Sequence, residues 1–120
     1  LVAGAVDNAR FNNIDNVEFA VADLSRGLGL THVGLTESSD PDKSIDLIVL
    51  DPPRNGASGV MPWVALAGAK QVIYISCHPS TMIRDAAVLS QAGYSLQAAG
   101  VMDMFPHTTH IEAMALFEKN

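Results

Sequence analysis

The chain contains one cysteine, Cys77, in the segment Ser76-Cys77-His78-Pro79, directly after the apolar run 71–75. This run is rich in β-branched and aromatic residues and predicts a strand, and the residues from Pro79 onward predict a helix. In open α/β sheets, reactive groups lie where such a strand turns into a helix. Cys77 is therefore a candidate nucleophile, although a lone cysteine is also typical of an inert, buried thiol.

A second polar segment, Asp51-Pro52-Pro53-Arg54, follows the nearly continuous apolar run 45–50. Two consecutive prolines cannot continue a helix or pair in a sheet ladder, so they fix a stiff, extended turn. This turn holds the carboxylate of Asp51 in place, although the same segment is also common as a plain turn. Asp23, after the alternating run 17–22, is a third candidate, because an acid there can bind an amine or ribose or cap a helix.

These candidates require a framework of alternating strands and helices. Apolar periodicity and turn residues predict helices at 1–13, 60–69 and 79–91, a surface excursion at 25–44, and strands at 17–22, 45–50, 71–76, 94–104 and 111–118. The run 45–50 predicts a central strand covered on both faces. The inward side chains expected in the last helix are Ile83, Ala86, Ala87 and Leu89. A short turn at 106–109 predicts an antiparallel hairpin, which closes the back half of a doubly wound, mostly parallel sheet of the α/β class.

Composition indicates one globular domain: 120 residues, 48% hydrophobic and 17% charged, with a mean hydropathy of +0.20. No apolar run approaches the roughly 20 residues of a membrane helix, and no signal peptide is visible, so we expect a cytoplasmic protein without a membrane partner. The net charge of −6 counts against a nucleic-acid partner, because phosphate binding normally requires a basic surface. Because the chain opens with Leu1 within a predicted helix, we expect a fragment of a longer protein.

Three motifs closely resemble those of the RNA (uracil-5-)-methyltransferases, which use S-adenosylmethionine. They are Asp51-Pro52-Pro53-Arg54-Asn55-Gly56, Ser76-Cys77-His78-Pro79 with Thr81 and Arg84-Asp85, and the segment from Met102 to Glu112. The likeness covers most of the chain and implies the carboxyl-terminal portion of a Rossmann-like methyltransferase domain. Within the family, the run 103–108 and the segment Ala92-Gly93-Tyr94 are more similar to the enzymes for 23S ribosomal RNA than to those for transfer RNA.

The resemblance implies methyl transfer to C5 of a uridine in RNA through a covalent adduct. A thiolate adds to C6 of the uracil, which makes C5 nucleophilic enough to take the methyl group. Cys77 matches this nucleophile, and Glu112 matches the base that removes the C5 proton afterwards. A free thiol is only a few per cent ionised at neutral pH, so Cys77 needs a proton acceptor or a favourable field, to which a helix start at Ser80 contributes.

The same resemblance implies the residues that bind cofactor and RNA. Asp51 matches the acid of a loop at the junction of cofactor and target base, and Asp23 falls where the family binds the adenine end of S-adenosylmethionine. Such enzymes extrude the target base from the RNA, here expected to be 23S ribosomal RNA. The residues expected to contact it lie in the neighbouring turns, where packing or solvent contact is an open alternative: Arg54, Phe105, His107 and His110.

The sequence also departs from the family pattern. His78 stands where the family usually has Asn, which puts details of base recognition in doubt. The first two strands, with the glycine-rich turn that binds the methionine and ribose parts of the cofactor, are missing. So is the upstream RNA-binding domain, which carries an iron–sulfur cluster in some members. We therefore expect residues 1–120 to be a partial catalytic domain whose unpaired sheet edges favour self-association.

Three alternatives remain open. A cysteine hydrolase would combine Cys77 with His78, His107 or His110, but it lacks a convincing oxyanion glycine motif. A metal site would use Cys77, His78 and His110, whose spacing is poor for zinc, so no metal is expected. The third alternative is a stable remnant that binds neither cofactor nor RNA on its own.

Overall fold

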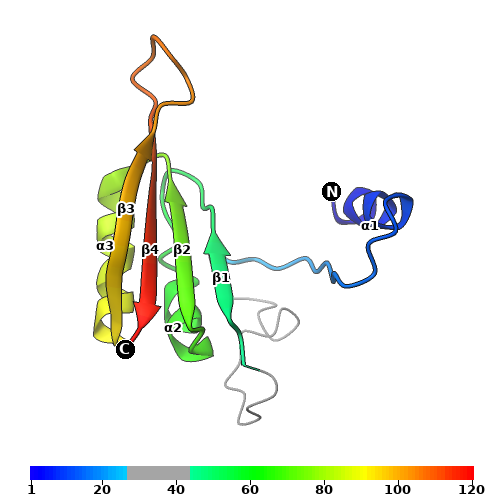
Figure 1. The fold of residues 1–120 in the computed structure, drawn as a ribbon, viewed down its shortest axis with the longest axis horizontal. Coiled ribbons are helices and arrows are strands. Elements are labelled where there is room, and N and C mark those ends of the chain that lie inside the picture. Colours follow the sequence, from blue (N-terminus) through cyan, green and yellow to red (C-terminus); the bar gives the residue numbers. More distant parts are fainter. Residues whose placement is uncertain (27–43) are drawn as a thin grey trace.

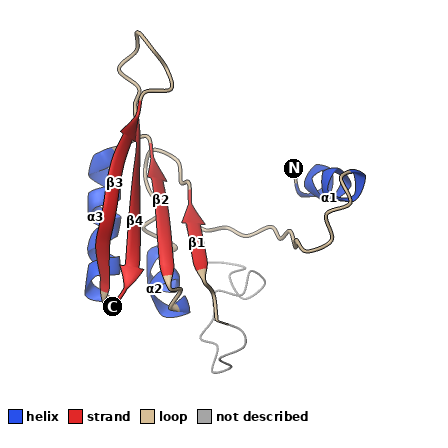
Figure 2. Cartoon of the chain, in the orientation of Figure 1, coloured by secondary structure: helices blue, strands red, loops and turns tan. Residues whose placement is uncertain are grey.

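The computed structural model describes residues 1–26 and 44–120. In chain order, the elements are α1 (Val2–Phe11), β1 (Leu47–Leu50), α2 (Met61–Ala67), β2 (Gln71–Ser76), α3 (Pro79–Gln91), β3 (Tyr94–Met102) and β4 (Glu112–Lys119), with helices blue and strands red in Figure 2. The surface excursion expected at 25–44 lies almost entirely outside the described residues. Within the described ranges, no helix is long and apolar enough to cross a membrane.

The strands form one mixed sheet in the order β1-β2-β4-β3 (Figure 1). Strands β1 and β2 are parallel, with Leu50 opposite Tyr74. Strand β4 is antiparallel to both of its neighbours, and it forms with β3 the hairpin that closes the sheet. The α/β class and the closing antiparallel hairpin predicted from the sequence are confirmed. The described strands are not mostly parallel as predicted, because only β1 and β2 are parallel and the hairpin strand β4 lies between β2 and β3.

Helices α2 and α3 cover one face of this sheet (Figure 1). The strands turn every second residue toward these helices, as the alternating burial of β2 and β4 shows. The core contains Met61, Val64, Val72, Tyr74, Leu89, Ala115 and Phe117. Burial of each large apolar side chain contributes about 1.5–3 kcal/mol, so this layer is the main source of stability.

Within residues 1–26 and 44–120, no helix covers the opposite face of the sheet. Strand β1 lies at the edge, with Leu47 and Val49 exposed by 44% and 56%. The prediction of a central strand covered on both faces at 45–50 is therefore wrong for the described residues. A continuous apolar run indicates that both faces of a strand can be buried, but it does not indicate whether neighbours are present to bury them.

Helix α1 lies apart from the sheet (Figure 1). It ends as predicted at the two asparagines, where Asn13 adopts a left-handed conformation with φ of 54°. The strand predicted at 17–22 is not formed, and only Asp23 makes an isolated bridge. Alternating β-branched and aromatic residues favour an extended chain, but a strand also needs a neighbour that pairs with its backbone groups.

Helix α3 begins and ends where the sequence predicts, but its inward face is different. Leu89 is buried and Ala86 is half-buried, as expected, whereas Ala87 is exposed and Ile83 is 69% exposed. Asp85 takes the inward position instead and is only 1% exposed. A pattern of apolar residues cannot identify a buried acid whose hydrogen bonds are made by distant parts of the chain.

Candidate active site

The predicted reactive residues lie at one end of the sheet, where β1 and β2 terminate and from which the loop between β3 and β4 projects (Figure 1). Cys77 directly follows β2, and Asp51 directly follows the parallel strand β1. The antiparallel register pairs Ser76 of β2 with Ala113 of β4. Cys77 and Glu112 are the residues that adjoin this last pair of the ladder. The two predicted catalytic residues therefore lie at the same end of β2 and β4.

Cys77 lies in a short turn between β2 and α3. The backbone N–H of His78 donates a hydrogen bond to Oγ of the buried Ser76 at 2.9 Å, which closes the chain around Cys77. The thiol is free and half-buried. Within the described ranges, no group of three His, Cys, Asp or Glu side chains is arranged to hold a metal ion, so Cys77, His78 and His110 do not form the alternative metal site.

The amino-terminal end of α3 adds a favourable field beside Cys77. This helix begins at Pro79, two residues after the cysteine, and has no acidic residue in its first turn. Free N–H groups at a helix start carry a partial positive charge that stabilises a nearby anion. The fold therefore places Cys77 just before the start of α3.

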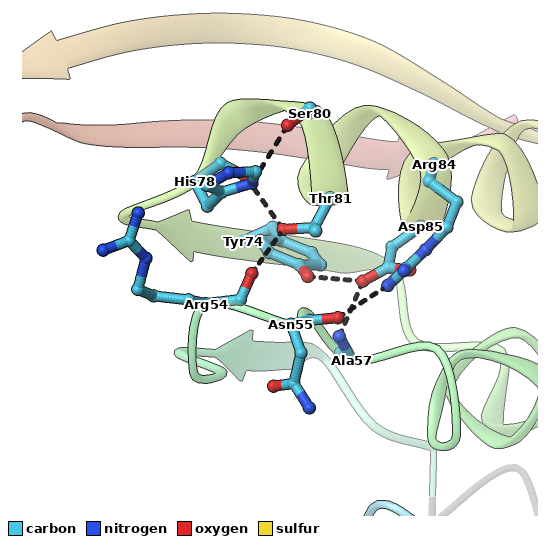
Figure 3. Close-up of polar contacts among 9 residues, drawn as sticks. All are labelled: Arg54, Asn55, Ala57, Tyr74, His78, Ser80, Thr81, Arg84 and Asp85. Carbon is cyan, nitrogen blue, oxygen red and sulfur yellow. Dashed lines mark hydrogen bonds and ion pairs between the residues drawn. The ribbon is translucent and has the colours of Figure 1, made fainter.

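Asp51 begins a loop that is tied to α3 through the loop backbone (Figure 3). We call residues Asp51–Ala57 the 51–57 loop. The three hydrogen bonds join Thr81 to the Arg54 carbonyl at 3.2 Å, Arg84 to the Asn55 carbonyl at 3.0 Å, and the Ala57 N–H to Asp85 at 2.6 Å. Because the backbone makes these contacts, the exposed side chains of Arg54 and Asn55 remain available.

Gly56 lies close against side chains of α3. Its φ of +82° is rarely adopted by residues with a side chain. A Cβ at this position would lie 2.6 Å from both Arg84 Nη2 and Asp85 Oδ2. Both the backbone conformation and the close approach therefore require glycine.

Asp85 is the buried centre of these contacts. Its Oδ2 accepts a hydrogen bond from the Tyr74 hydroxyl at 2.6 Å, and its Oδ1 lies 2.8 Å from Nη2 of Arg84. Burial, together with the hydrogen bond to Asp85 and the negative charge of that residue, raises the pKa of Tyr74 well above its ordinary value. Tyr74 therefore remains a hydrogen-bond donor throughout the physiological pH range.

A cavity of about 290 Å³ lies beside the 51–57 loop. It is lined by the end of β1, the loop and the following residues to Val60, with Leu24 and Ser25 on the other side. Asp51 supplies a carboxylate, and Leu50, Pro52 and Pro53 supply apolar walls. Its size is close to the lower end of small-molecule sites, about 300 Å³. The lining fits a ligand that combines hydroxyl or amine donors with an apolar ring.

Asp23 lies beside this cavity but does not line it. Its Oδ1 accepts hydrogen bonds from the backbone N–H of Ser25 at 3.1 Å and from the Ser25 hydroxyl at 2.6 Å. Gly59 packs so closely on this turn that a Cβ there would lie 2.7 Å from the carbonyl carbon of Ser25. The turn is therefore held against the cavity, while the Asp23 carboxylate is used largely within the turn itself.

The residues Asp103–Ile111 form the 103–111 loop, which carries the other expected RNA contacts. Its three candidate residues Phe105, His107 and His110 are all exposed. Thr108 Oγ1 donates to the Phe105 carbonyl at 2.6 Å and accepts from the His110 N–H at 3.2 Å. The loop thus presents these residues at the same end of the sheet as Cys77, but outside the cavity.

Sequence reasoning assigns no role to Asp85 or Tyr74, which connect the loop to the core. A signal for Asp85 is nevertheless present. Thr81, Asp85 and Leu89 are spaced four residues apart and therefore share one face of the helix. An acid in line with a buried leucine indicates a buried polar contact, although its partners cannot be inferred from the helix alone.

Polar groups at the carboxyl ends of the parallel strands of an α/β sheet are typical of the class of Rossmann-like proteins. The comparison with known families then identifies the group within this class. The chain belongs to the tRNA (Uracil-5-)-methyltransferase family, whose family model matches residues 1–120. This match confirms the resemblance indicated by the three motifs.

Two curated relatives named 23S rRNA (uracil(1939)-C(5))-methyltransferase RlmD match almost the whole chain. The protein of Hahella chejuensis is 47% identical over 116 residues, which are 93% of this chain and 24% of the relative. The protein of Aeromonas salmonicida is 47% identical over 119 residues, which are 99% of this chain and 26% of the relative. The chain therefore spans about a quarter of the length of these relatives.

Two solved structures resemble the fold. The Pyrococcus abyssi tRNA (uracil-54, C5)-methyltransferase, in complex with S-adenosyl-L-homocysteine, has a TM-score of 0.70 and 29% identity, covering 97% of this chain and 26% of that chain. TYW2 of M. jannaschii, in complex with AdoMet, has a TM-score of 0.62 and 14% identity, covering 99% of this chain and 53% of that chain. The second likeness supports the fold alone.

Proposed function

We propose that residues 1–120 carry the catalytic residues of an S-adenosylmethionine-dependent RNA (uracil-5-)-methyltransferase. The observation that supports the proposal is that the β2–β4 ladder ends at Ser76 and Ala113, so that Cys77 and Glu112 both adjoin its last pair, at the end of the sheet where β1 leads into Asp51. A thiol and a carboxylate at one end of the sheet suit a reaction that needs a nucleophile and a base on one pyrimidine ring. Family membership over the whole chain supports the same reaction.

In the proposed reaction, Cys77 acts first and Glu112 last. The Cys77 thiolate adds to C6 of the uracil, and the electron pair of the C5–C6 double bond makes C5 nucleophilic, so that C5 takes the methyl group. Glu112 then removes the proton from C5, the double bond re-forms, and Cys77 leaves as a thiolate.

The cofactor, S-adenosylmethionine, supplies a methyl group activated by its positively charged sulfur. We propose that Asp51 accepts hydrogen bonds from its amine or hydroxyl groups, while Pro52 and Pro53 contact its apolar parts. Asp23 is proposed to bind the adenine end from beside the cavity through Oδ2, whose contact to Arg26 is long at 3.7 Å. The S-adenosyl-L-homocysteine complex of the Pyrococcus abyssi enzyme supports this choice of cofactor.

RNA is the proposed macromolecular partner, and the names of the curated relatives support 23S ribosomal RNA. Arg54 has an exposed side chain that is suited to phosphate, because its carbonyl alone is used in holding the loop. Phe105 is 50% exposed and offers a face on which a base can stack. His107 and His110 extend the same contact surface. With a net charge of −6, we expect most of the basic RNA-binding surface to lie on other parts of the enzyme.

We further propose that residues 1–120 are a partial catalytic domain. The chain covers about a quarter of its relatives, and among the described residues Leu47 and Val49 of the edge strand β1 are 44% and 56% exposed. We expect the isolated chain to bind S-adenosylmethionine weakly and to self-associate through this edge. Any iron–sulfur cluster would lie outside these residues. A monomer in sedimentation experiments at all concentrations would exclude the self-association.

Substitution of the two proposed catalytic residues in the full-length enzyme tests the reaction. Cys77→Ala should abolish methylation, whereas Glu112→Gln should still transfer the methyl group but accumulate a covalent RNA adduct. Labelled RNA on a denaturing gel measures the adduct, and methyl label measures the transfer. Ser95→Ala, at the other end of the sheet, is the control. A stable adduct formed by Cys77→Ala would rule out Cys77 as the nucleophile.

A further inference from the structure

Asp85 joins a strand, a loop and a helix through its two carboxylate oxygens. Its Oδ2 accepts hydrogen bonds from the Tyr74 hydroxyl and from the Ala57 N–H, both at 2.6 Å. Its Oδ1 pairs with Arg84, which in turn donates to the Asn55 carbonyl at 3.0 Å. Figure 3 shows these contacts converging between β2, α3 and the 51–57 loop.

These contacts require a carboxylate rather than an amide. Aspartate accepts at both oxygens, whereas asparagine would turn its NH2 group either toward Arg84 or toward Tyr74 and Ala57. Either orientation places a donor against a donor at a position that is 1% exposed. Because an unmet buried hydrogen bond is costly, Asp85→Asn breaks the contact while the side-chain shape is kept.

The sheet ladder cannot hold the 51–57 loop in place. Strand β1 ends at Leu50, and neither Pro52 nor Pro53 has an N–H to donate. The Gly56 N–H is used within the loop, on the Pro53 carbonyl at 2.8 Å. The position of the loop therefore depends on its contacts to α3.

We propose that Asp85 is a positioning residue that fixes Asp51 relative to Cys77. It ties the loop that begins at Asp51 to the helix that begins two residues after Cys77. The proposal rests on the proposed function, in which both residues serve one reaction. Loss of the tie should slow the reaction without removing any reacting group, because a displacement of about 1 Å costs up to about 100-fold in rate.

The first test measures whether Asp85 holds the 51–57 loop, by amide hydrogen exchange of Ala57 in the full-length enzyme. Asp85→Asn weakens the link in either orientation, because its NH2 group opposes either the Ala57 N–H or the Arg84 guanidinium, so exchange of the Ala57 amide should become at least about 10-fold faster, while exchange in β4 stays unchanged. Leu89→Ala is the matched control, because Leu89 is buried on the same helix face but is not bonded to the loop. Unchanged Ala57 exchange in Asp85→Asn would overturn the proposal.

The second test measures kcat and KM for RNA methylation by the same two variants. Asp85→Asn should lower kcat at least about 10-fold, with KM for RNA and cofactor changed by less than about 3-fold. Leu89→Ala should keep its kcat at temperatures where it is folded. An unchanged kcat in Asp85→Asn, or equal losses in both variants, would overturn the positioning role.

Tyr74→Phe keeps the proposal testable if Asp85→Asn does not fold. It removes one donor to Asp85, and it should speed Ala57 exchange and lower kcat by about 3-fold. A Tyr74→Phe enzyme unchanged in both measurements would overturn the proposal. A wild-type enzyme that methylates no uridine, while Ala57 exchange still depends on Asp85, would instead overturn the proposed function.

Discussion

The 51–57 loop and the 103–111 loop lie at the same end of the sheet, but they are held in different ways. Three backbone groups of the 51–57 loop are bonded to α3, at distances from 2.6 to 3.2 Å. The 103–111 loop is shaped by bonds among its own residues, centred on Thr108, and it projects from the sheet (Figure 1). The 51–57 loop is thus held by a helix that packs on the core, and the 103–111 loop is held by hydrogen bonds within the loop.

This difference suits the roles proposed for the two loops. A group that must meet a reacting atom at a defined distance benefits from a rigid support, because the cost of ordering it is met during folding. A surface that contacts RNA of irregular shape benefits from residues that can adjust. Changes to the bonds that hold the 51–57 loop should therefore affect turnover, and changes in the 103–111 loop should affect RNA binding.

Gly56→Ala should have the largest effect, because it breaks the contact that distinguishes the two loops. The positive φ and the displaced Arg84 and Asp85 side chains together should cost about 2–3 kcal/mol of unfolding free energy, measured by urea denaturation. Methylation kcat should fall with it. Gly100→Ala is the control, because an added Cβ there meets nothing within 4 Å. Equal effects of the two substitutions would contradict the close contact at Gly56.

High pH should weaken the support of the 51–57 loop by a smaller amount. Burial first, then the bond to Asp85 and its charge, raise the pKa of Tyr74 in the fold. The resulting stability is fully present below the ordinary tyrosine pKa of about 10 and is lost as the pH rises above it, because the unfolded chain releases the proton first.

The expected loss from Tyr74 is about 1 kcal/mol of unfolding free energy between pH 10 and 11. Urea denaturation at several pH values measures it. Tyr74→Phe should flatten this slope, and Tyr94→Phe should do so as well, because burial raises the pKa of Tyr94. A slope that is unchanged in Tyr74→Phe would show that this hydroxyl is not protected by the fold.

Thr108→Ala should have the smallest effect on stability, about 0.5–1 kcal/mol, because it removes local hydrogen bonds at an exposed site. The KM for RNA should rise several-fold while kcat is nearly unchanged, measured by steady-state methylation. Thr108→Ser, which keeps the hydroxyl, is the control and should behave as the wild type. A loss confined to kcat would remove the distinction between the two loops.

Sequence reasoning was most successful where local signals decide the structure. Strand β2 and helix α3 have the predicted bounds, because a dense apolar run and the following proline specify them without reference to the remaining chain. The antiparallel hairpin follows from a short connection between two strands. The placement of Cys77, Asp51 and Glu112 at one end of the sheet follows from these elements.

The remaining features depend on partners that no local pattern contains. Residues 17–22 have strand propensity but no neighbour for their backbone, and β1 has an apolar sequence but an uncovered face. Asp85 is buried because Tyr74, Ala57 and Arg84 come to it from three separate segments. Apolar periodicity favours Ile83 and Ala87 as inward residues, because it treats every acid as exposed.

The three bonds from the 51–57 loop to α3 use two of its carbonyl groups and one N–H, and no side chain of the loop takes part in them. Apart from the requirement for glycine at Gly56 and for any residue except proline at Ala57, the support makes little demand on the loop sequence. Arg54 and Asn55 can therefore be exchanged without detaching the loop. Enzymes that share this support could acquire different RNA targets by such exchanges while inheriting the same reaction geometry.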